Sequence, residues 1–356
     1  MDVMPNKIEK FVVLPASCVL AILMMEVIVR ILDISPRPLA LLPISTYRLS
    51  ASPILRFEYR PGYRPTDQPF DSDHKGFEIN HVGFRDYEYP EQKPEGTYRI
   101  VVLGDSTTAG NGVPTLDDIY SKRLEKRLTA LTDKSIRYEV LNMGVGGYQT
   151  LQEVETLRAT GLKYNPDMVL VTFCVNDFDL QSDGGVYTRV LYQHSNYAGH
   201  YLNTIYDTLL RVSRLAFIIN YRFNVSLRTY DEMYTKDILK GQTTVRAGLS
   251  LLSKLQQDRG FPAIVVLLPA FDAPFSEYKY SHIHDEVFRS AEDLSNIVVI
   301  DLLHSFARVD NNADRFSNDG IHMNEHGHDV MAAILLPIIW QRSRQSADSV
   351  STTQRR

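Results

Sequence analysis

The residues of this chain that are most able to do chemistry lie in short stretches far apart in the sequence. Ser106 follows a glycine and an aspartate at the end of the apolar run 98–103. His322 lies near the end of the chain, three positions after Asp319. A serine hydroxyl is a weak nucleophile until a base takes its proton, and an imidazole oriented by a carboxylate is well suited to that task. Asp319 and His322 can therefore supply a general base for Ser106 in an acyl-transfer reaction.

Each of these residues also has a simpler structural interpretation. Ser106 could cap the N-terminus of a helix, since serine is a preferred capping residue. Asp319 and the glycine after it could form a turn before the last helix, with His322 at the surface. Residues three apart are neighbours on one helical turn, so Asp319 can bind one nitrogen of His322 and leave the other facing Ser106. The chemical interpretation is favoured because two further stretches supply the remaining groups that such a reaction needs.

These two further stretches can donate hydrogen bonds to an oxyanion. The sequence Asn-Met-Gly-Val-Gly-Gly at 142–147 follows a predicted strand, and its glycines let the backbone point N–H groups into a site without side chains in the way. Asn176 follows the long apolar run 168–175, and its amide can donate to a developing negative charge. One such donor stabilises a transition state by about 3 kcal/mol. A tight loop at the glycines and a β-turn at Asn176 are simpler interpretations that do not exclude this role.

Three histidines near the C-terminus could bind a metal ion instead. His322, His326 and His328 lie close to Asp319 in the sequence, and histidine is the commonest metal ligand. No cysteine joins this group, and residues two apart point to different faces of a helix. We therefore expect neither a metal ion nor an organic cofactor. We expect His326 and His328 to be solvated residues in the first turn of the last helix.

The four stretches resemble, in the same order, the sequence blocks of the SGNH hydrolases, the superfamily of GDSL-type esterases and lipases. The matching blocks are Gly-Asp-Ser at 104–106, Asn-x-Gly-x-x-Gly at 142–147, Asn-Asp at 176–177 and Asp-x-x-His at 319–322. The resemblance implies that Ser106 is the nucleophile, His322 the base and Asp319 its partner. It also implies an oxyanion hole formed by the N–H groups of Ser106 and Gly147 and the side chain of Asn176.

The resemblance covers residues 98–342 and has two departures. Thr107 stands where the leucine that names the GDSL motif would be, and Val175 stands where glycine is more usual before the asparagine. Upstream, the sequence Asn-His-Val-Gly-Phe-Arg-Asp at 80–86 resembles a segment that precedes the catalytic block in many bacterial SGNH proteins. Its short apolar–polar alternation with a glycine turn indicates a structural role.

The elements that must position these residues alternate between strands and helices. The expected strands are 98–103, 138–142, 168–175, 262–269 and 297–301, and the expected helices are 115–132, 148–161, 243–259, 283–294 and 324–342. Such alternation predicts a parallel, doubly wound α/β sheet. The resemblance implies a flavodoxin-like three-layer α/β/α domain with a mostly parallel five-stranded sheet. Sheets of this kind bind ligands at the carboxyl ends of their strands, where the candidate residues lie.

The N-terminal segment is apolar enough to suggest a membrane anchor. Residues 11–32 are almost all apolar, and roughly 20 such residues can span a bilayer as a helix. No small-residue cleavage site follows, so we favour an uncleaved, single-pass transmembrane helix over a signal peptide or a buried helix. The charges on its two sides do not decide its orientation. Similarity to membrane-anchored bacterial SGNH proteins implies a catalytic domain on the extracytoplasmic side.

Five segments complete the predicted organisation around this anchor. Residues 1–10 form a short tail, 33–97 form an extended leader packed on the catalytic domain, and 98–342 form that domain. Residues 178–240 form an insertion over the site that could bind a sugar, form a helical cap or face the membrane. Residues 343–356 are polar and are expected to be disordered.

Composition excludes some classes of function. The net charge of −5 over 356 residues gives no basic footprint for nucleic acid. Cys18 lies in the apolar N-terminal segment and Cys174 on a predicted core strand, so no disulfide between them is expected. We expect a serine esterase whose substrate is a carboxylic ester, which could be an acylated glycan or lipid, with O-acetyl groups of a glycan as one case. An O-acetyltransferase acting on a cell-surface polysaccharide and a catalytically inactive membrane protein of the same fold stay open as alternatives.

Overall fold

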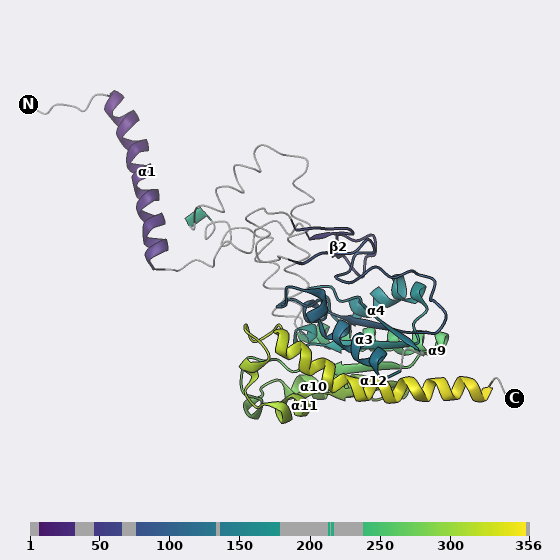
Figure 1. Ribbon diagram of the computed structural model, residues 1–356. Coiled ribbons are helices and arrows are strands. Elements are labelled where there is room, and N and C mark those ends of the chain that lie inside the picture. Colours follow the sequence, from purple (N-terminus) through teal and green to yellow (C-terminus); the bar gives the residue numbers. More distant parts are fainter. Residues whose placement is uncertain are drawn as a thin grey trace, which may run out of the picture. The chain divides into compact units, whose positions relative to one another are not determined.

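The computed structural model describes the following residues: 7–32, 46–65, 76–132, 136–178, 213, 215–216 and 238–353 (Figure 1). Contacts divide the chain into one unit of Met1–Pro43 with Leu191–Thr235 and a second unit of Ile44–Val190 with Lys236–Arg356. The insertion expected at 178–240 lies almost wholly outside the described residues.

A five-stranded parallel sheet forms the centre of the second unit, with the strand order β4-β3-β5-β6-β7. Its strands are β3 (Thr97–Gly104), β4 (Arg137–Asn142), β5 (Met168–Phe173), β6 (Ala263–Leu267) and β7 (Ile297–Asp301). Every residue of β5 and β6 is buried, as expected for parallel strands covered on both faces. The predicted flavodoxin-like sheet is confirmed. Its strand order reverses between β3 and β5, and ligands bind at such a switch point.

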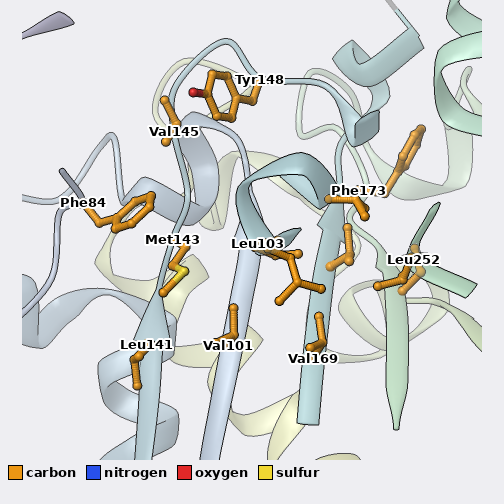
Figure 2. Packing of buried hydrophobic residues seen from close by; sticks show 14 of the residues in the cluster. Phe84, Val101, Leu103, Leu141, Met143, Val145, Tyr148, Val169, Phe173 and Leu252 are labelled. Atoms are coloured by element: carbon orange, nitrogen blue, oxygen red, sulfur yellow. The ribbon is translucent and has the colours of Figure 1, made fainter. Parts of the chain in front are cut away.

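Helices cover both faces of this sheet. They are α3 (Tyr120–Ala130), α4 (Thr150–Ala159), α9 (Ile238–Arg259), α10 (Ser281–Ala291), α11 (Leu303–Val309) and α12 (Glu325–Thr353). Alternate residues of β3 enter different clusters: Val101 and Leu103 pack with α4, α9 and α10, and Ile100 and Val102 pack with α3, α11 and α12. Figure 2 shows the first cluster, in which Val101 and Leu103 of β3 lie between Leu141 of β4 and Val169 of β5. The three-layer arrangement follows from this alternation.

The leader contributes a small antiparallel hairpin, β1 (Tyr47–Leu49) and β2 (Phe57–Tyr59). Phe57 and Tyr59 are fully or almost fully buried in the same cluster as the central strands. The described part of the leader therefore packs on the catalytic domain through aromatic side chains. Residues 33–45 and 66–75 of the leader lie outside the described residues.

Helix α1 (Lys7–Ile31) occupies the apolar N-terminal segment. Among the residues that the structure describes, no helix has the length and apolar character needed to cross a membrane, so the transmembrane helix expected at 11–32 is not supported. Within its own unit, Glu26 pairs with Arg30 at 2.7 Å. The Glu26 carboxylate also accepts hydrogen bonds from Ser213 Oγ at 2.8 Å and from Leu215 N at 2.9 Å.

The C-terminal helix is longer than the sequence predicts. A disordered tail was expected from residue 343, but α12 continues to Thr353. Tyr138 of β4 shares a hydrogen bond of 2.8 Å with Ser343 Oγ, and its ring lies 6.3 Å from that of Trp340. These contacts hold the helix at the predicted boundary. No glycine or proline follows before Thr353, so helix propagation meets no stop signal.

Candidate active site

Ser106 is the first residue of the short helix α2 (Ser106–Ala109), directly after β3. Asp105, and not Ser106, is the N-cap, because its carboxylate accepts a hydrogen bond of 2.8 Å from Thr107 N. The serine hydroxyl therefore does not cap the helix and is free to interact with a base. β3 is one of the two strands at the switch point, so Ser106 stands at the edge of the sheet where ligands bind.

His322 lies within hydrogen-bond distance of both expected partners. Its Nδ1 is 2.7 Å from Asp319 Oδ2, and its Nε2 is 3.0 Å from Ser106 Oγ. Because an ionised carboxylate can only accept, Nδ1 carries the hydrogen and Nε2 is left to accept from the serine. The other oxygen of Asp319 accepts from the backbone N–H groups of Ile321 and His322, at 2.9 and 2.7 Å. The loop that carries the base therefore also fixes its orienting carboxylate.

The protonation state of Asp319 suits this role. Partial burial acts to raise the pKa of its carboxyl, but the hydrogen bonds from His322 and from two backbone N–H groups outweigh burial and lower the pKa to about 2. The carboxylate is therefore ionised at neutral pH. An ionised partner stabilises the imidazolium that forms when His322 takes a proton.

The oxyanion donors expected from the sequence lie in segments that adjoin the turn of the nucleophile: Asn176 contacts Asp105, and a Cβ on Gly146 would lie 3.5 Å from Ser106 Cβ. Gly147 has a φ of 84°, a conformation that glycine adopts without strain. Within the described part of the chain, no acceptor binds the N–H groups of Ser106 or Gly147. Asn176, in the 3-10 helix η5 (Val175–Phe178) after β5, donates one amide hydrogen to Asp105 Oδ2 at 2.8 Å. Its second amide hydrogen is available to a ligand, since an amide nitrogen has two.

The structure separates the three C-terminal histidines. Both ring nitrogens of His322 are engaged by Asp319 and Ser106. His326 is exposed, whereas His328 is fully buried. The expectation that His328 is solvated is wrong. Residues two apart lie on different faces of a helix, so His328 lies on the buried face of α12 whereas His326 lies on its exposed face. Burial lowers the pKa of His328 to about 3, so the ring is neutral at physiological pH.

His328 belongs to the packing between α12 and α3. Its ring stacks on that of Tyr120, with centroids 5.9 Å apart, and its Nδ1 accepts a hydrogen bond of 3.3 Å from Tyr120 N. His326 stacks instead on Phe316, with centroids 5.5 Å apart. The two side chains therefore serve different contacts and do not join His322 in one group.

Two residues of the leader, Arg85 and Asp86, contact the segments that carry the site residues. The sequence did not reveal these contacts. Arg85 is buried and donates to four carbonyl oxygens in the segment 109–114 that follows α2. Asp86 accepts a hydrogen bond of 2.6 Å from Asn142 N and pairs with Lys122 at 2.7 Å. The leader thus holds both the turn that carries the nucleophile and the start of the glycine-rich loop. The Gly-Phe-Arg-Asp sequence at 83–86 could have indicated this support, but only a structural role was predicted for it.

A cavity of about 770 Å³ opens beside the triad. Its lining includes Asn176 and Asp319, apolar side chains such as Leu268 and Ile283, and a polar wall that contains Tyr280. The cavity therefore places both apolar surface and hydrogen-bonding groups next to the expected position of a reacting carbonyl.

Comparison with known proteins gives a family match. The model of the GDSL-like Lipase/Acylhydrolase family matches residues 102–330. No match was found among curated proteins. The chain is similar to the solved structure of a lipase/acylhydrolase from Enterococcus faecalis, with 19% identity and a TM-score of 0.42 over 69% of this chain and 96% of that one. It is similar to an acetyl xylan esterase with 16% identity and a TM-score of 0.42 over 68% and 99% of the two chains. A catalytic mutant of an acetylxylan esterase from Geobacillus stearothermophilus gives 15% identity and a TM-score of 0.40 over 67% and 93%.

Proposed function

Because the chain belongs to the GDSL-like lipase/acylhydrolase family, we propose that it hydrolyses a carboxylic ester through an acyl-enzyme formed on Ser106. The family makes it a hydrolase acting on ester bonds. The observation that supports the finer proposal best is the unbroken series of contacts from Asp319 through His322 to Ser106, at 2.7 and 3.0 Å. A serine hydroxyl is activated when it hydrogen-bonds to a base and that base hydrogen-bonds to an orienting carboxylate.

In this proposal His322 Nε2 takes the proton of Ser106 as Oγ attacks the ester carbonyl carbon. The carbonyl oxygen becomes an oxyanion that accepts from the N–H groups of Ser106 and Gly147 and from the amide of Asn176. His322 then gives its proton to the leaving alcohol, and the acyl group stays on Ser106. Water, deprotonated by the same imidazole, attacks the acyl-enzyme and releases the carboxylic acid.

The substrate we propose is an O-acetylated glycan. The cavity of about 770 Å³ beside the triad is far larger than an acetyl group requires, so most of it is available to the alcohol part of the ester. The lining of the cavity includes Asp272, Tyr280 and Glu286, whose oxygen atoms can hydrogen-bond sugar hydroxyls. Tyr280 also presents a ring on which a sugar face can pack.

The test uses the full-length protein with two kinds of ester. The protein should release acetate from p-nitrophenyl acetate and from acetylated xylan or mannan oligosaccharides, and should act weakly on p-nitrophenyl palmitate. Ser106→Ala should abolish release, whereas Ser250→Ala, a change at an exposed serine of α9, should leave it unchanged. Full activity in a folded Ser106→Ala variant would contradict the mechanism. A clear preference for the palmitate ester would contradict the glycan, and acetyl transfer to added glycan in place of acetate release would show an acetyltransferase.

A further inference from the structure

We propose that Tyr47 and Tyr59 of the leader hairpin are positioning residues that aim the Gly147 N–H at the oxyanion. The inference rests on the proposed function, since it concerns the same reaction. It makes the hairpin β1–β2 a part of the catalytic unit, although the hairpin lies outside the sequence blocks that carry the family resemblance.

The two tyrosine hydroxyls bind both sides of one glycine. Tyr47 Oη donates to the carbonyl oxygen of Gly146 at 3.1 Å, and Gly146 N donates to Tyr59 Oη at 2.9 Å. The rings of Tyr47 and Tyr59 lie against each other, with centroids 4.8 Å apart. Two adjacent tyrosines of the hairpin thus hold the N–H and the carbonyl of Gly146.

The contact between Tyr47 and the Gly146 carbonyl fixes the direction of the next N–H group. The carbonyl of Gly146 and the N–H of Gly147 belong to one peptide unit, and in a planar trans peptide they point in opposite directions. No cis peptide occurs among the described residues. Because Tyr47 holds the Gly146 carbonyl on the hairpin side, the Gly147 N–H must point away from the hairpin. Donation to the carbonyl also polarises the peptide, which strengthens its N–H as a donor.

The nucleophile lies close to this peptide unit. A Cβ placed on Gly146 would be 3.5 Å from Ser106 Cβ, 2.5 Å from Tyr47 Oη and 3.1 Å from Tyr59 Oη. Gly146 is thus packed between the two hydroxyls and Ser106, and any side chain at this position would displace Tyr47. The glycine allows the hairpin to approach the loop closely enough to control its backbone.

The hairpin is itself rigidly held. Tyr59 is almost completely buried, and burial raises its pKa to about 12, so its hydroxyl stays protonated at neutral pH. The Tyr148 hydroxyl donates to the carbonyl of Phe57, and Gln152 Nε2 donates to the carbonyl of Leu55 at 3.0 Å. Figure 2 shows Tyr148 and Val145 on the loop beyond the end of β4. The chain on both sides of Gly147 is therefore docked on the same hairpin.

The test removes the hydroxyls and keeps the rings. Tyr47→Phe and Tyr59→Phe should each lower kcat by roughly tenfold with KM changed less than about twofold, since an oxyanion donor acts in the transition state and not on the bound ester. The double variant should lose little more than the more damaging single variant, because both hydroxyls act on one peptide unit. Phenylboronic acid, which forms a tetrahedral adduct with an active serine, should bind more weakly by a similar factor.

Tyr148→Phe is the matched control. It removes a buried hydroxyl that docks the loop on the hairpin but leaves both contacts to Gly146 in place. It should lower Tm and leave kcat and boronate binding within about twofold of the wild type. If Tyr47→Phe and Tyr59→Phe behave as Tyr148→Phe does, with a lower Tm and an unchanged kcat, the hairpin only stabilises the fold and the inference is wrong. An inactive wild-type protein would instead overturn the proposed function.

Discussion

The carboxylate of Asp105 should orient Asn176 in addition to capping α2. Its two oxygens accept from Thr107 N and from Asn176 Nδ2, each at 2.8 Å, and the side chain is fully buried. Asparagine at this position keeps the volume and can still accept from Thr107. It then presents an NH₂ group to Asn176, whose own NH₂ group is also a donor. Asp105→Asn should therefore break the contact with Asn176 and preserve the cap.

The contacts of Asp105 set the expected losses of stability and of kcat in the Asp105→Asn variant. A hydrogen bond to a charged group stabilises a fold by about 1.5–3 kcal/mol, and losing it sets the expected fall in the free energy of unfolding. A misoriented Asn176 amide cannot reduce transition-state stabilisation by more than the complete loss of this donor would, which is about 2.7–4 kcal/mol. We expect Asp105→Asn to lower kcat by roughly tenfold to a hundredfold, equivalent to about 1.4–2.7 kcal/mol, with KM little changed.

A double-mutant cycle with Asn176→Ala tests this reasoning, with kcat measured on p-nitrophenyl acetate. If Asp105 acts through Asn176, then Asp105→Asn should change kcat less than about twofold when residue 176 is already alanine. Asn312→Ala is the control, since Asn312 caps the 3-10 helix η8 (Ala313–Arg315) with its side chain in the same way. It should leave kcat unchanged. Additive effects of Asp105→Asn and Asn176→Ala would refute the coupling.

Three further outcomes follow from the site. His322→Ala should lower kcat about as far as Ser106→Ala does, because base and nucleophile act as a unit, and Asp319→Ala should lower it less; equal steady-state losses for both would count against Asp319 as the orienting group. EDTA should leave hydrolysis unchanged, and activity lost in EDTA but restored by zinc would contradict this. His328 should make stability depend on pH. Burial lowers its pKa from 6.5 to about 3, so the unfolded chain binds more protons between these values and stability falls as pH falls through that window. Urea unfolding should show a contribution of about 2 kcal/mol between pH 7 and pH 5 that disappears in His328→Phe; an unchanged pH dependence in that variant would contradict the assignment.

The sheet could be predicted from the sequence because its central strands, β5 and β6 among them, are buried on both faces. Such strands are near-continuous apolar runs. The edge strand β7 is only partly buried, yet its short apolar run was predicted with its observed bounds. β5 was predicted to end at residue 175 but ends at Phe173. The apolar residues Cys174 and Val175 line the cavity beyond the strand, and an apolar run does not show where a strand ends and a loop begins.

The candidate triad could be predicted because each of its residues lies in a short block of sequence, and the blocks follow one another in a recognisable order. The groups that support it could not, since Tyr47, Tyr59, Arg85 and Asp86 reach the site through contacts between distant parts of the chain. Nothing in the spacing of two tyrosines in a short hairpin indicates that their hydroxyls meet at Gly146. The same limit explains the C-terminal helix, whose extension depends on packing against β4 and not on its own polar composition.

Covalent labelling of the active serine tests whether Ser106 is the nucleophile. The full-length protein is treated with a fluorophosphonate probe, digested and analysed by mass spectrometry, with Ser106→Ala and Ser250→Ala treated in parallel. We expect one adduct per chain on Ser106, unchanged in Ser250→Ala and absent from Ser106→Ala, with loss of hydrolysis in proportion to labelling. An adduct on a different residue that accompanies the loss of hydrolysis, or full turnover by a folded Ser106→Ala variant, would contradict it.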